Sequence, residues 1–361
     1  MASKLHVLIV GAGTGGLMLA VLLERASISY AVFEKAKELK PLGSAIVITS
    51  LMHIFEQLDM KGDILAMSKP FGALHIREET LNLKGSFFVR HPYGYDNKER
   101  YGDYPTVLAR PDLIKYLLSH IPADKIHYNK RVETTVQDEN QVVIQCHDGS
   151  EHNGNILVGA DGAYSTVRSN MYKELGGTGI LPAADTQPLS YDYDCVVGIT
   201  KSLDLETYAV FLEKFCEFEV VLGKEIPFTM VPFGGQGANM AILSAVELAN
   251  LLYDAESVTQ DELTRIFKEY YEIRHPISRF AVEQSNQNGA LIHKRGILGD
   301  IARYLLLHWA PAWLIKMHAD RFNVYRPQVS FLPFVKLGGS FKSKTSKPSR
   351  RMQDPALSRI D

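Results

Sequence analysis

The chain opens on a run of apolar residues that ends in a cluster of glycines. Leu5–Val10 is continuously apolar, which is typical of a strand covered on both faces of a parallel sheet. Leu17–Leu23 is apolar over helical length, and Tyr30–Phe33 predicts a second strand. Together these segments predict a strand–helix–strand crossover of about thirty residues.

Further along the chain, helical and strand patterns alternate. Helices are predicted at Ser50–Leu58, Pro111–Ile121, Gly237–Leu252 and Gln260–Tyr271. Strands are predicted at 72–77 and 86–90, in a β-meander of Ile126–Tyr128, Arg131–Val136 and Gln141–Cys146, and at the buried-type segment Ile156–Ala160. Residues 188–222 are aromatic and β-prone, and we expect the Ser- and Lys-rich stretch from 339 onward to be disordered.

Length and composition narrow the class of protein. With 361 residues, the chain can form one large domain or two closely joined domains. Hydrophobic residues make up 46% and charged residues 22%, which is typical of a soluble folded protein. Because the net charge is −2, no overall field favours nucleic acid, and no nucleic-acid partner is expected.

The cysteines and the start of the chain indicate a cytoplasmic, intracellular protein. Cys146, Cys195 and Cys216 are widely spaced, so they predict neither a disulfide framework nor a metal site. Met1–Lys4 leads directly into a short apolar run, whereas a signal peptide has a longer apolar region and a small-residue cleavage site. We therefore predict no signal peptide.

One apolar segment has to be judged as a possible membrane-spanning helix or membrane contact. Tyr304–Ile315 contains two tryptophans but also His308 and Pro311, and it is shorter than the roughly 20 residues that a membrane-spanning helix needs. We therefore predict no transmembrane segment but a broken helix that packs on the body or covers a pocket. Peripheral contact with a membrane surface through 304–315 is the weaker alternative.

The glycine cluster Gly11–Gly16 fits the pattern G-x-G-x-x-G. The pattern alone is weak, but here it follows a buried strand and opens a helix, as in dinucleotide-binding sites. Gly11 would allow the tight turn, Gly13 would let a pyrophosphate approach the backbone, and Gly16 would let the helix pack closely on the strand. These three glycines are the first predicted cofactor-binding residues.

An acidic residue completes this dinucleotide signature. Glu34 ends the second predicted strand, where a carboxylate can accept hydrogen bonds from the hydroxyls of an adenosine ribose. It would also repel a 2′-phosphate, which disfavours NADP at this site. The loop and Glu34 predict a dinucleotide, but they leave FAD and NAD open.

A second motif favours FAD over NAD. The segment Ile156–Arg168 reads ILVGADGAYSTVR, with Asp161, Gly162, Ser165 and Arg168 after an apolar strand. It resembles the Asp-Gly motif of the single-component FAD monooxygenases, the flavoprotein aromatic hydroxylases, and among them the fungal members most closely. In that family the motif helps to hold FAD near its pyrophosphate and is implicated in the use of NAD(P)H.

The resemblance extends to the segment Pro232–Ala241, which contains P-x-x-G-Q-G-x-N. In the family this stretch opens a helix whose amino end faces the flavin, which implies roles for Gly235, Gly237 and Ala238. Backbone amides and the positive end of such a helix would stabilise negative charge on the flavin ring.

Three further positions correspond to positions that contact FAD in the family. Arg110, before a predicted helix, corresponds to an arginine that reaches FAD. Glu34-Lys35 resembles the acidic–basic pair at the ribose, with Lys35 where arginine is commoner. Val47 stands in the segment after that pair where glycine is frequent, so the resemblance implies only a backbone contact there.

The chain departs from the family before Pro232. The family has G-D-A-x-H there, and its aspartate contacts the ribityl chain of FAD. That aspartate falls on Glu225, with Lys224 in place of glycine and Phe228 in place of histidine. The stretch from Asp161 to this point is also short for the family. We therefore expect a truncated substrate domain and impaired activity, caused by a real deletion or by an error in the gene model.

The resemblance implies an α/β fold: a Rossmann-like, glutathione-reductase-like FAD-binding domain, an interleaved and truncated β-rich substrate domain, and a helical C-terminal part. The expected division is 1–70 and 108–185 for the FAD-binding domain, 71–107 and 186–227 for the substrate-side β segments, 228–300 for a return to the FAD-binding domain with helices, 301–338 for a C-terminal helix and apolar segment, and 339–361 for the disordered tail.

The implied function is FAD-dependent monooxygenation. NAD(P)H would reduce FAD, and O₂ would then supply one oxygen to an organic small molecule, by hydroxylation or epoxidation. Because the cofactor carries this chemistry, no catalytic side chain is assigned. Two alternatives stay open: an FAD-binding protein without turnover, and an NAD-linked dehydrogenase. The sequence does not predict the substrate or the oligomeric state.

Overall fold

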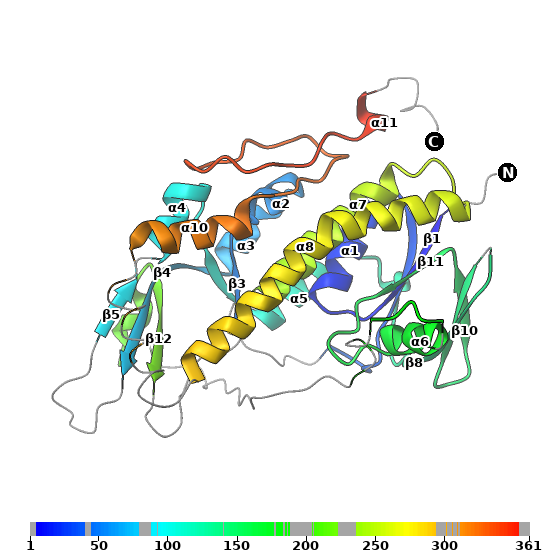
Figure 1. The fold of residues 1–361 in the computed structure, drawn as a ribbon, viewed down its shortest axis with the longest axis horizontal. Coiled ribbons are helices and arrows are strands. Elements are labelled where there is room, and N and C mark those ends of the chain that lie inside the picture. The colour runs from blue at the N-terminus through cyan, green and yellow to red at the C-terminus, as the bar shows by residue number, and fades with distance from the viewer. Residues whose placement is uncertain are drawn as a thin grey trace.

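The fold is described from a computed structural model of the 361-residue chain (Figure 1). The described residues are 5–39, 45–78, 88–91, 93–139, 141–176, 178–182, 206–222, 236–293 and 311–353, with the single positions 185, 187, 204, 301, 305 and 309.

A four-stranded parallel sheet contains the strands of the predicted strand–helix–strand crossover. Its strands are β1 (His6–Val10), β2 (Ser29–Phe33), β7 (Ile126–His127) and β11 (Ile156–Gly159), in the order β11-β1-β2-β7. On one face, Val7 and Ile9 pack against helix α1 (Thr14–Arg25), while on the other Leu8 and Val10 belong to a second cluster. Both faces of β1 are therefore buried, which explains its uninterrupted apolar run.

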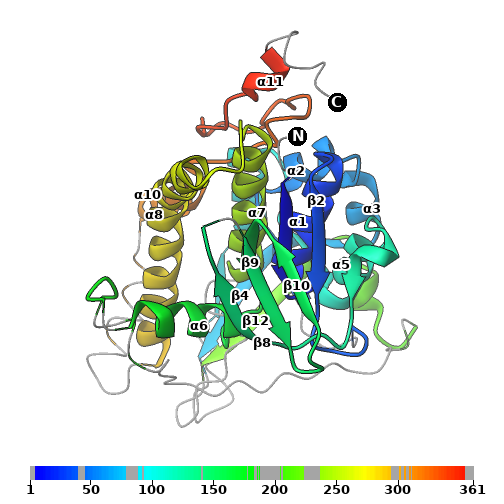
Figure 2. The same cartoon turned by 90° about the vertical axis from the view of Figure 1, so that its right-hand side faces the viewer.

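The second cluster is closed by an antiparallel meander of β8 (Val132–Gln137), β9 (Val142–Cys146) and β10 (Glu151–Gly154), in the order β10-β9-β8. Figure 2 shows the meander on one side of the parallel sheet, with α1 on the other. The prediction that Ile126–Tyr128 belongs to the meander is wrong. Ile126 pairs with Val32 of β2 instead, because β2 offers a free parallel edge to a short strand.

A third sheet lies at the opposite end of the molecule (Figure 1). It contains β3 (Ala45–Ile48), β4 (Lys69–Glu78), β5 (Phe88–His91), β6 (Thr106–Ala109) and β12 (Cys216–Leu222), in the order β12-β4-β6-β3 with β5 also paired to β4. The strands predicted at 72–77 and 86–90 are confirmed as β4 and β5.

Helices cover these sheets. They are α2 (Met52–Gln57), α3 (Lys61–Ala66), α4 (Tyr93–Tyr101), α5 (Arg110–Leu118), α6 (Thr166–Leu175), α7 (Gly237–Tyr253), α8 (Gln260–His293), α10 (Ala312–Asn323) and α11 (Arg350–Gln353). Helix α7 packs directly on α1, where an added Cβ on Gly15 would lie 3.2 Å from the Ala241 Cβ. The largest apolar cluster includes the buried residues of both helices.

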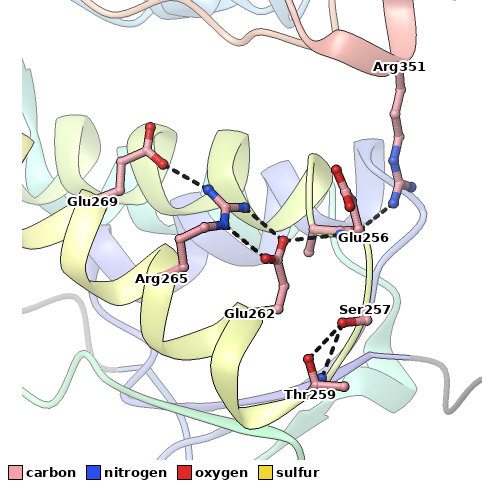
Figure 3. Close-up of polar contacts among 8 residues, drawn as sticks. Glu256, Ser257, Thr259, Glu262, Arg265, Glu269 and Arg351 are labelled. Carbon is pink, nitrogen blue, oxygen red and sulfur yellow. Dashed lines mark hydrogen bonds and ion pairs between the residues drawn. The ribbon is translucent and has the colours of Figure 1, made fainter.

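Helix α8 is longer than predicted, since it continues from Tyr271 through Pro276 to His293. Its first turns are stabilised by charged side chains, with Arg265 donating to Glu262 (2.7 and 2.8 Å) and to Glu269 (3.1 Å) (Figure 3). The i,i+3 and i,i+4 spacing of these partners is favourable on a helix surface.

Helix α10 is held against α4 by polar contacts. Arg100 of α4 makes an ion pair with Asp320, and the Tyr101 hydroxyl donates to the same carboxylate at 2.8 Å. Lys316 lies 3.6 Å from Asp96, which adds a third link between the helices. These contacts join the C-terminal part to the sheet of β4.

The apolar segment predicted to pack on the body is exposed where it is described. Pro311 caps the amino end of α10, so the predicted interruption of the helix is confirmed. Trp309 is 71% exposed, Trp313 is 65% exposed, and Leu305 is 52% exposed. The predicted packing is therefore wrong for these three side chains, since Pro311 starts a helix that contacts α4 through its polar residues instead.

The prediction of a disordered tail from residue 339 is wrong for residues 339–353. Ser340 and Phe341 donate from their backbone amides to the carbonyls of α4, and Ser349 is fully buried. Arg351 donates to the Ala255 carbonyl in the loop between α7 and α8 (Figure 3). These partners lie far away in the sequence, so composition alone could not indicate them. Residues 354–361 lie outside the described part.

A buried histidine anchors the segment after α10 to α2. His53 is 3% exposed, and its Nε2 lies 2.8 Å from the Pro327 carbonyl oxygen, so Nε2 carries the hydrogen. Burial, and then the positive charge of Arg326, lower the pKa of His53 from 6.5 to about 4. His53 is therefore neutral in the folded protein at neutral pH.

This histidine predicts a loss of stability in mild acid. Between pH 6.5 and 4 the unfolded chain binds a proton at His53 that the folded chain does not, so unfolding becomes easier as the pH falls. From the two pKa values, the free energy of unfolding should drop by about 3 kcal/mol across this range. Urea unfolding of the wild type and of His53→Gln measures it, and the variant should lack this component. As a control, the exposed His147→Gln should keep the wild-type drop, and equal drops in wild type and His53→Gln would contradict the prediction.

Candidate functional site

The glycine loop lies where β1 passes into α1. Gly11 has a φ of +107°, and an added Cβ would lie 2.5 Å from the Ala160 carbonyl oxygen, so only glycine fits there. Gly16 permits close packing, since an added Cβ would overlap the Gly11 carbonyl oxygen. By contrast, an added Cβ on Gly13 would meet nothing within 4 Å. The backbone at Gly13 is therefore open to a ligand, as the sequence predicted for a pyrophosphate.

The amino end of α1 is suited to an anion. Its N-cap is Gly13, which offers no side chain to the first amides, and the first turn contains no acidic residue. The unpaired N–H groups and the positive end of the helix dipole therefore remain available to a phosphate.

Glu34 connects the glycine loop to the end of β2. Its carboxylate accepts hydrogen bonds from the amides of Ala12 and Ala36, each at 2.9 Å. Burial, and then the charge of Glu34, raise the pKa of Tyr128. An ionised carboxylate has about four acceptor positions, so two remain for ribose hydroxyls. Glu34 thus has a structural role besides the predicted one, whereas Lys35 is exposed.

The Asp-Gly turn touches the glycine loop. An added Cβ on Gly11 would lie 2.9 Å from the Asp161 Cα, because β11 and β1 are neighbours that end at the same edge of the sheet. Asp161 Oδ2 accepts from the amides of Thr166 (2.7 Å) and Val167 (3.3 Å) at the start of α6. Gly162 has a φ of +84°, and Ser165 caps α6 by accepting from the Arg168 amide at 3.0 Å.

The second oxygen of Asp161 has no such role. Oδ1 is buried and has no hydrogen-bond partner among the residues that the structure describes. This oxygen has almost no accessible surface in the protein without a ligand, so protein atoms cover it. The close approach of the Asp161 backbone to Gly11 is what places this turn beside the predicted cofactor site.

At the predicted flavin end of the site, the side chain of Asn239 forms a polar clasp between the start of α7 and the end of β3. Asn239, in the first turn of α7, donates to the Val47 carbonyl at 2.9 Å and accepts from the Thr49 amide at 3.2 Å. Asn239 is 1% exposed. Sequence reasoning did not assign this residue a role, although it stands at the end of the P-x-x-G-Q-G-x-N stretch. The clasp joins β3 to the start of α7.

The remaining predicted residues surround this clasp or lie outside the described part. Gly237 and Ala238 form the first turn of α7, whose N-cap Gln236 makes no side-chain cap and whose first turn has no acidic residue. Arg110 begins α5, directly after Ala109, which pairs with Ala45 of β3. Arg110 is exposed and has no ion-pair partner among the described residues. The predicted residues Glu225 and Gly235 lie outside the described residues, as does the altered segment 224–228.

These observations fit FAD. The open backbone at Gly13 and the free amino end of α1 suit a pyrophosphate, and Glu34 has acceptor positions left for a ribose. Asp161 ends at the same edge of the parallel sheet as the glycine loop, and the start of α7 has no side-chain cap. The glycine loop, Glu34 and Asp161 therefore meet at one edge of the parallel sheet, and α7 packs on α1 beside them.

Asp161→Asn tests the predicted role of Asp161 in binding FAD. Asparagine keeps an oxygen for the Thr166 and Val167 amides but removes the carboxylate charge, so the fold should persist while the predicted contact with FAD is weakened. We expect FAD to bind about tenfold more weakly, a cost of about 1.4 kcal/mol. Fluorescence titration with FAD measures the affinity, and thermal unfolding without FAD checks the fold. Asp148→Asn, in the exposed turn between β9 and β10, is the control. Unchanged affinity in Asp161→Asn would exclude the contact.

Comparisons with known proteins agree with this geometry. Residues 4–192 match the protein family described as FAD binding domain. The protein named FAD-dependent monooxygenase ausM of Aspergillus calidoustus is 32% identical over 202 residues, which is 55% of this chain and 42% of the relative. Over that alignment, the chain thus spans less than half the length of the relative. The ausM protein of Penicillium brasilianum is 24% identical over 445 residues, covering 96% of this chain and 91% of the relative.

The longer alignment shows a difference in length between this chain and that relative. An alignment of 445 positions against a chain of 361 residues leaves at least 84 positions of that relative without a counterpart. This chain is therefore shorter than that relative within the aligned span.

Solved structures show the same fold. Klebsiella pneumoniae HpxO, in a crystal structure complexed with FAD and uric acid, superposes with a TM-score of 0.62 at 18% identity, covering 89% of this chain and 97% of that one. The tetracycline destructase Tet(51) gives 0.55 at 16% identity, with the same coverage. The predicted α/β class, with its parallel sheet and helical C-terminal part, is confirmed.

Proposed function

Because the chain belongs to the FAD binding domain family, we propose that it is an FAD-dependent monooxygenase that uses NAD(P)H and O₂ on an organic small molecule. The observation that carries the proposal is the convergence of Gly13, Glu34 and Asp161 at one edge of the parallel sheet, with the start of α7 beside α1. An NAD-linked dehydrogenase needs only the first two of these features. The name FAD-dependent monooxygenase, which the fungal relatives carry, supports the same reaction class.

When bound, FAD would accept a hydride and activate O₂. The amides at the start of α1 would hold the pyrophosphate, and Glu34 would orient the ribose while it fixes the loop through Ala12. Asp161, which contacts the glycine loop and holds the start of α6, would lie beside the pyrophosphate. The free amides at the start of α7 would stabilise negative charge on the flavin ring, and Asn239 would hold that helix end against β3.

The first test is the flavin itself. Purified protein should be yellow and should release FAD when denatured, whereas colourless protein that binds NAD would support the dehydrogenase alternative. The second test measures NADH and NADPH oxidation, O₂ uptake and H₂O₂ release with a panel of aromatic and polycyclic substrates. Product that contains ¹⁸O from ¹⁸O₂ would establish monooxygenation. FAD binding without consumption of either reductant across the panel would favour a flavin-binding protein without turnover.

We also propose that the exposed apolar residues before and within α10 contact a membrane surface. This proposal is supported by the exposure of Leu305, Trp309 and Trp313, each of which is more than half exposed. Tryptophan is favoured at membrane interfaces. No helix in the described ranges has the length and apolarity needed to cross a bilayer. Co-sedimentation with phosphatidylcholine vesicles should fall in Trp309→Ser/Trp313→Ser, and equal binding by wild type and variant would reject the contact.

A further inference from the structure

The segment from residue 336 to the end of α11 carries charge of a single sign. Residues 336–353 contain six Lys and Arg residues and no Asp or Glu. Because the whole chain has a net charge of −2, the other residues together carry −8. Protein surfaces ordinarily mix both signs. Five of the six basic side chains are exposed, and these five define the basic strip: Lys336, Lys342, Lys344, Lys347 and Arg350.

The backbone of the basic strip is fixed by hydrogen bonds to the body. The amides of Ser340 and Phe341 donate to carbonyls of α4 at 3.0 and 2.9 Å. The Lys344 amide donates at 2.8 Å to the carbonyl of Val324, which directly follows α10. The basic side chains are therefore held together as a group, whereas on a disordered tail their mutual repulsion would spread them apart.

The side chains of the basic strip have no acidic partner. None of the five makes an ion pair within 4 Å among the residues that the structure describes. Hydrogen bonds from Arg265, and to a smaller extent the charge of Arg350, lower the pKa of Glu262. That carboxylate is already bonded to Arg265 at 2.7 and 2.8 Å. The positive charge of the strip is therefore available to a partner.

The basic strip lies on the outside of the molecule. Figures 1 and 2 both show the segment between α10 and α11 along one outer edge. Phe341 and Ser343 are partly buried, whereas Lys342 and Lys344 are exposed, so the two lysines point away from the body. A flat, negatively charged partner can therefore reach them.

Exposed apolar side chains accompany these charges. Val324 lies beside Lys344, Phe334 lies two residues before the strip, and Met352 belongs to α11 at its end. All three apolar side chains are exposed. Basic and apolar side chains on one surface are typical of attachment to anionic lipid, because the charges attract headgroups while the apolar groups enter the interface. Nucleic acid would use the charges but not the aliphatic side chains.

We propose that the basic strip docks the protein on an anionic bilayer surface, such as a leaflet that contains phosphatidylserine. The lysines and Arg350 contact headgroup phosphates and carboxylates, and Val324 and Met352 reach the apolar boundary. The same surface repels the −8 carried by the other residues, so it orients the protein with this edge toward the bilayer. This docking depends on charge and needs no bound FAD. It also differs from the contact proposed for the tryptophans at α10, which does not require anionic lipid.

Co-sedimentation of the full chain with two kinds of vesicle tests this docking. Vesicles of phosphatidylcholine with about one-third phosphatidylserine should bind at least about tenfold more tightly than pure phosphatidylcholine. Raising the ionic strength from about 0.05 to about 0.5 M should remove this preference, because salt screens the charges. Equal binding to both vesicles at low salt would overturn the proposal. Binding to polyuridylate RNA without binding to the anionic vesicles would assign the strip to nucleic acid and would also overturn it.

Lys342→Gln/Lys344→Gln tests whether the strip is the docking surface. Both side chains are exposed, so the variant should melt like the wild type. Its affinity for the anionic vesicles should fall about 25-fold, at about fivefold per charge, while its binding to neutral vesicles should not change.

Lys115→Gln/Lys173→Gln is the matched control, since it removes the same charge from exposed positions on α5 and α6. This control should keep the wild-type affinity for anionic vesicles. Equal losses in the two variants would show that net charge and not the strip governs binding, and would contradict the proposal. Trp309→Ser/Trp313→Ser should instead weaken binding to both kinds of vesicle, which separates the two membrane contacts.

Discussion

Gly13→Val is expected to yield a folded protein that no longer retains FAD. Gly13 has a φ of −80°, which any residue adopts, and a side chain there would meet nothing within 4 Å in the protein. The fold should therefore accept valine. The same open space is where a pyrophosphate approaches the backbone, so the isopropyl group would exclude it. We expect FAD affinity to fall at least 100-fold, a cost of about 2.7 kcal/mol.

The ratio of flavin to protein absorbance in purified samples measures this loss, and fluorescence titration gives the affinity. Without FAD, Gly13→Val should melt within about 1–2 °C of the wild type. Gly62→Val is the matched control, because Gly62 in α3 also has open space around an added Cβ but lies outside the predicted site. This control should keep its flavin, and retention of flavin by Gly13→Val would refute the assignment of the phosphate loop.

The parts of the site that the sequence predicted are those set by neighbours in the chain. A glycine turn between an apolar strand and a helix can form in few ways, so Gly11, Gly13 and Gly16 could be assigned from spacing. Glu34 follows from the same crossover, because β2 must end beside β1. The structure adds that Glu34 already binds the Ala12 and Ala36 amides, a role that spacing does not reveal.

The missed features depend on contacts between distant parts of the chain. Asn239 bonds to residues some 190 positions earlier, so its clasp on Val47 and Thr49 has no local signal. Ile126 pairs with β2 rather than with the meander for the same reason. Residues 339–353 have the composition of a disordered tail, yet their amides find acceptors on α4 and in the C-terminal segment itself. Composition indicates how prone a segment is to disorder, but it does not indicate which distant residues the segment will contact.

Gly16→Val is expected to destabilise the fold itself, although it is the same substitution three residues later. An added Cβ on Gly16 would overlap the Gly11 carbonyl oxygen and lie 3.2 Å from the Ala160 Cβ. The Gly11 backbone cannot move aside easily, because its amide donates to the Phe33 carbonyl at 2.8 Å and its other side faces Ala160. Since α1 also packs on α7, a shift of α1 would disturb the largest apolar cluster.

Overpacking of a close backbone contact costs about 1–3 kcal/mol for small additions, and three carbon atoms against a backbone oxygen should exceed about 3 kcal/mol. Urea unfolding without FAD measures this, and the midpoint of Gly16→Val should fall well below those of wild type and Gly13→Val. Because no cofactor is present, the loss would belong to the packing of α1 on β1 and not to ligand binding. A Gly16→Val midpoint equal to that of the wild type would show that α1 does not lie as close to Gly11 as described, and the loop would then have to be assigned afresh.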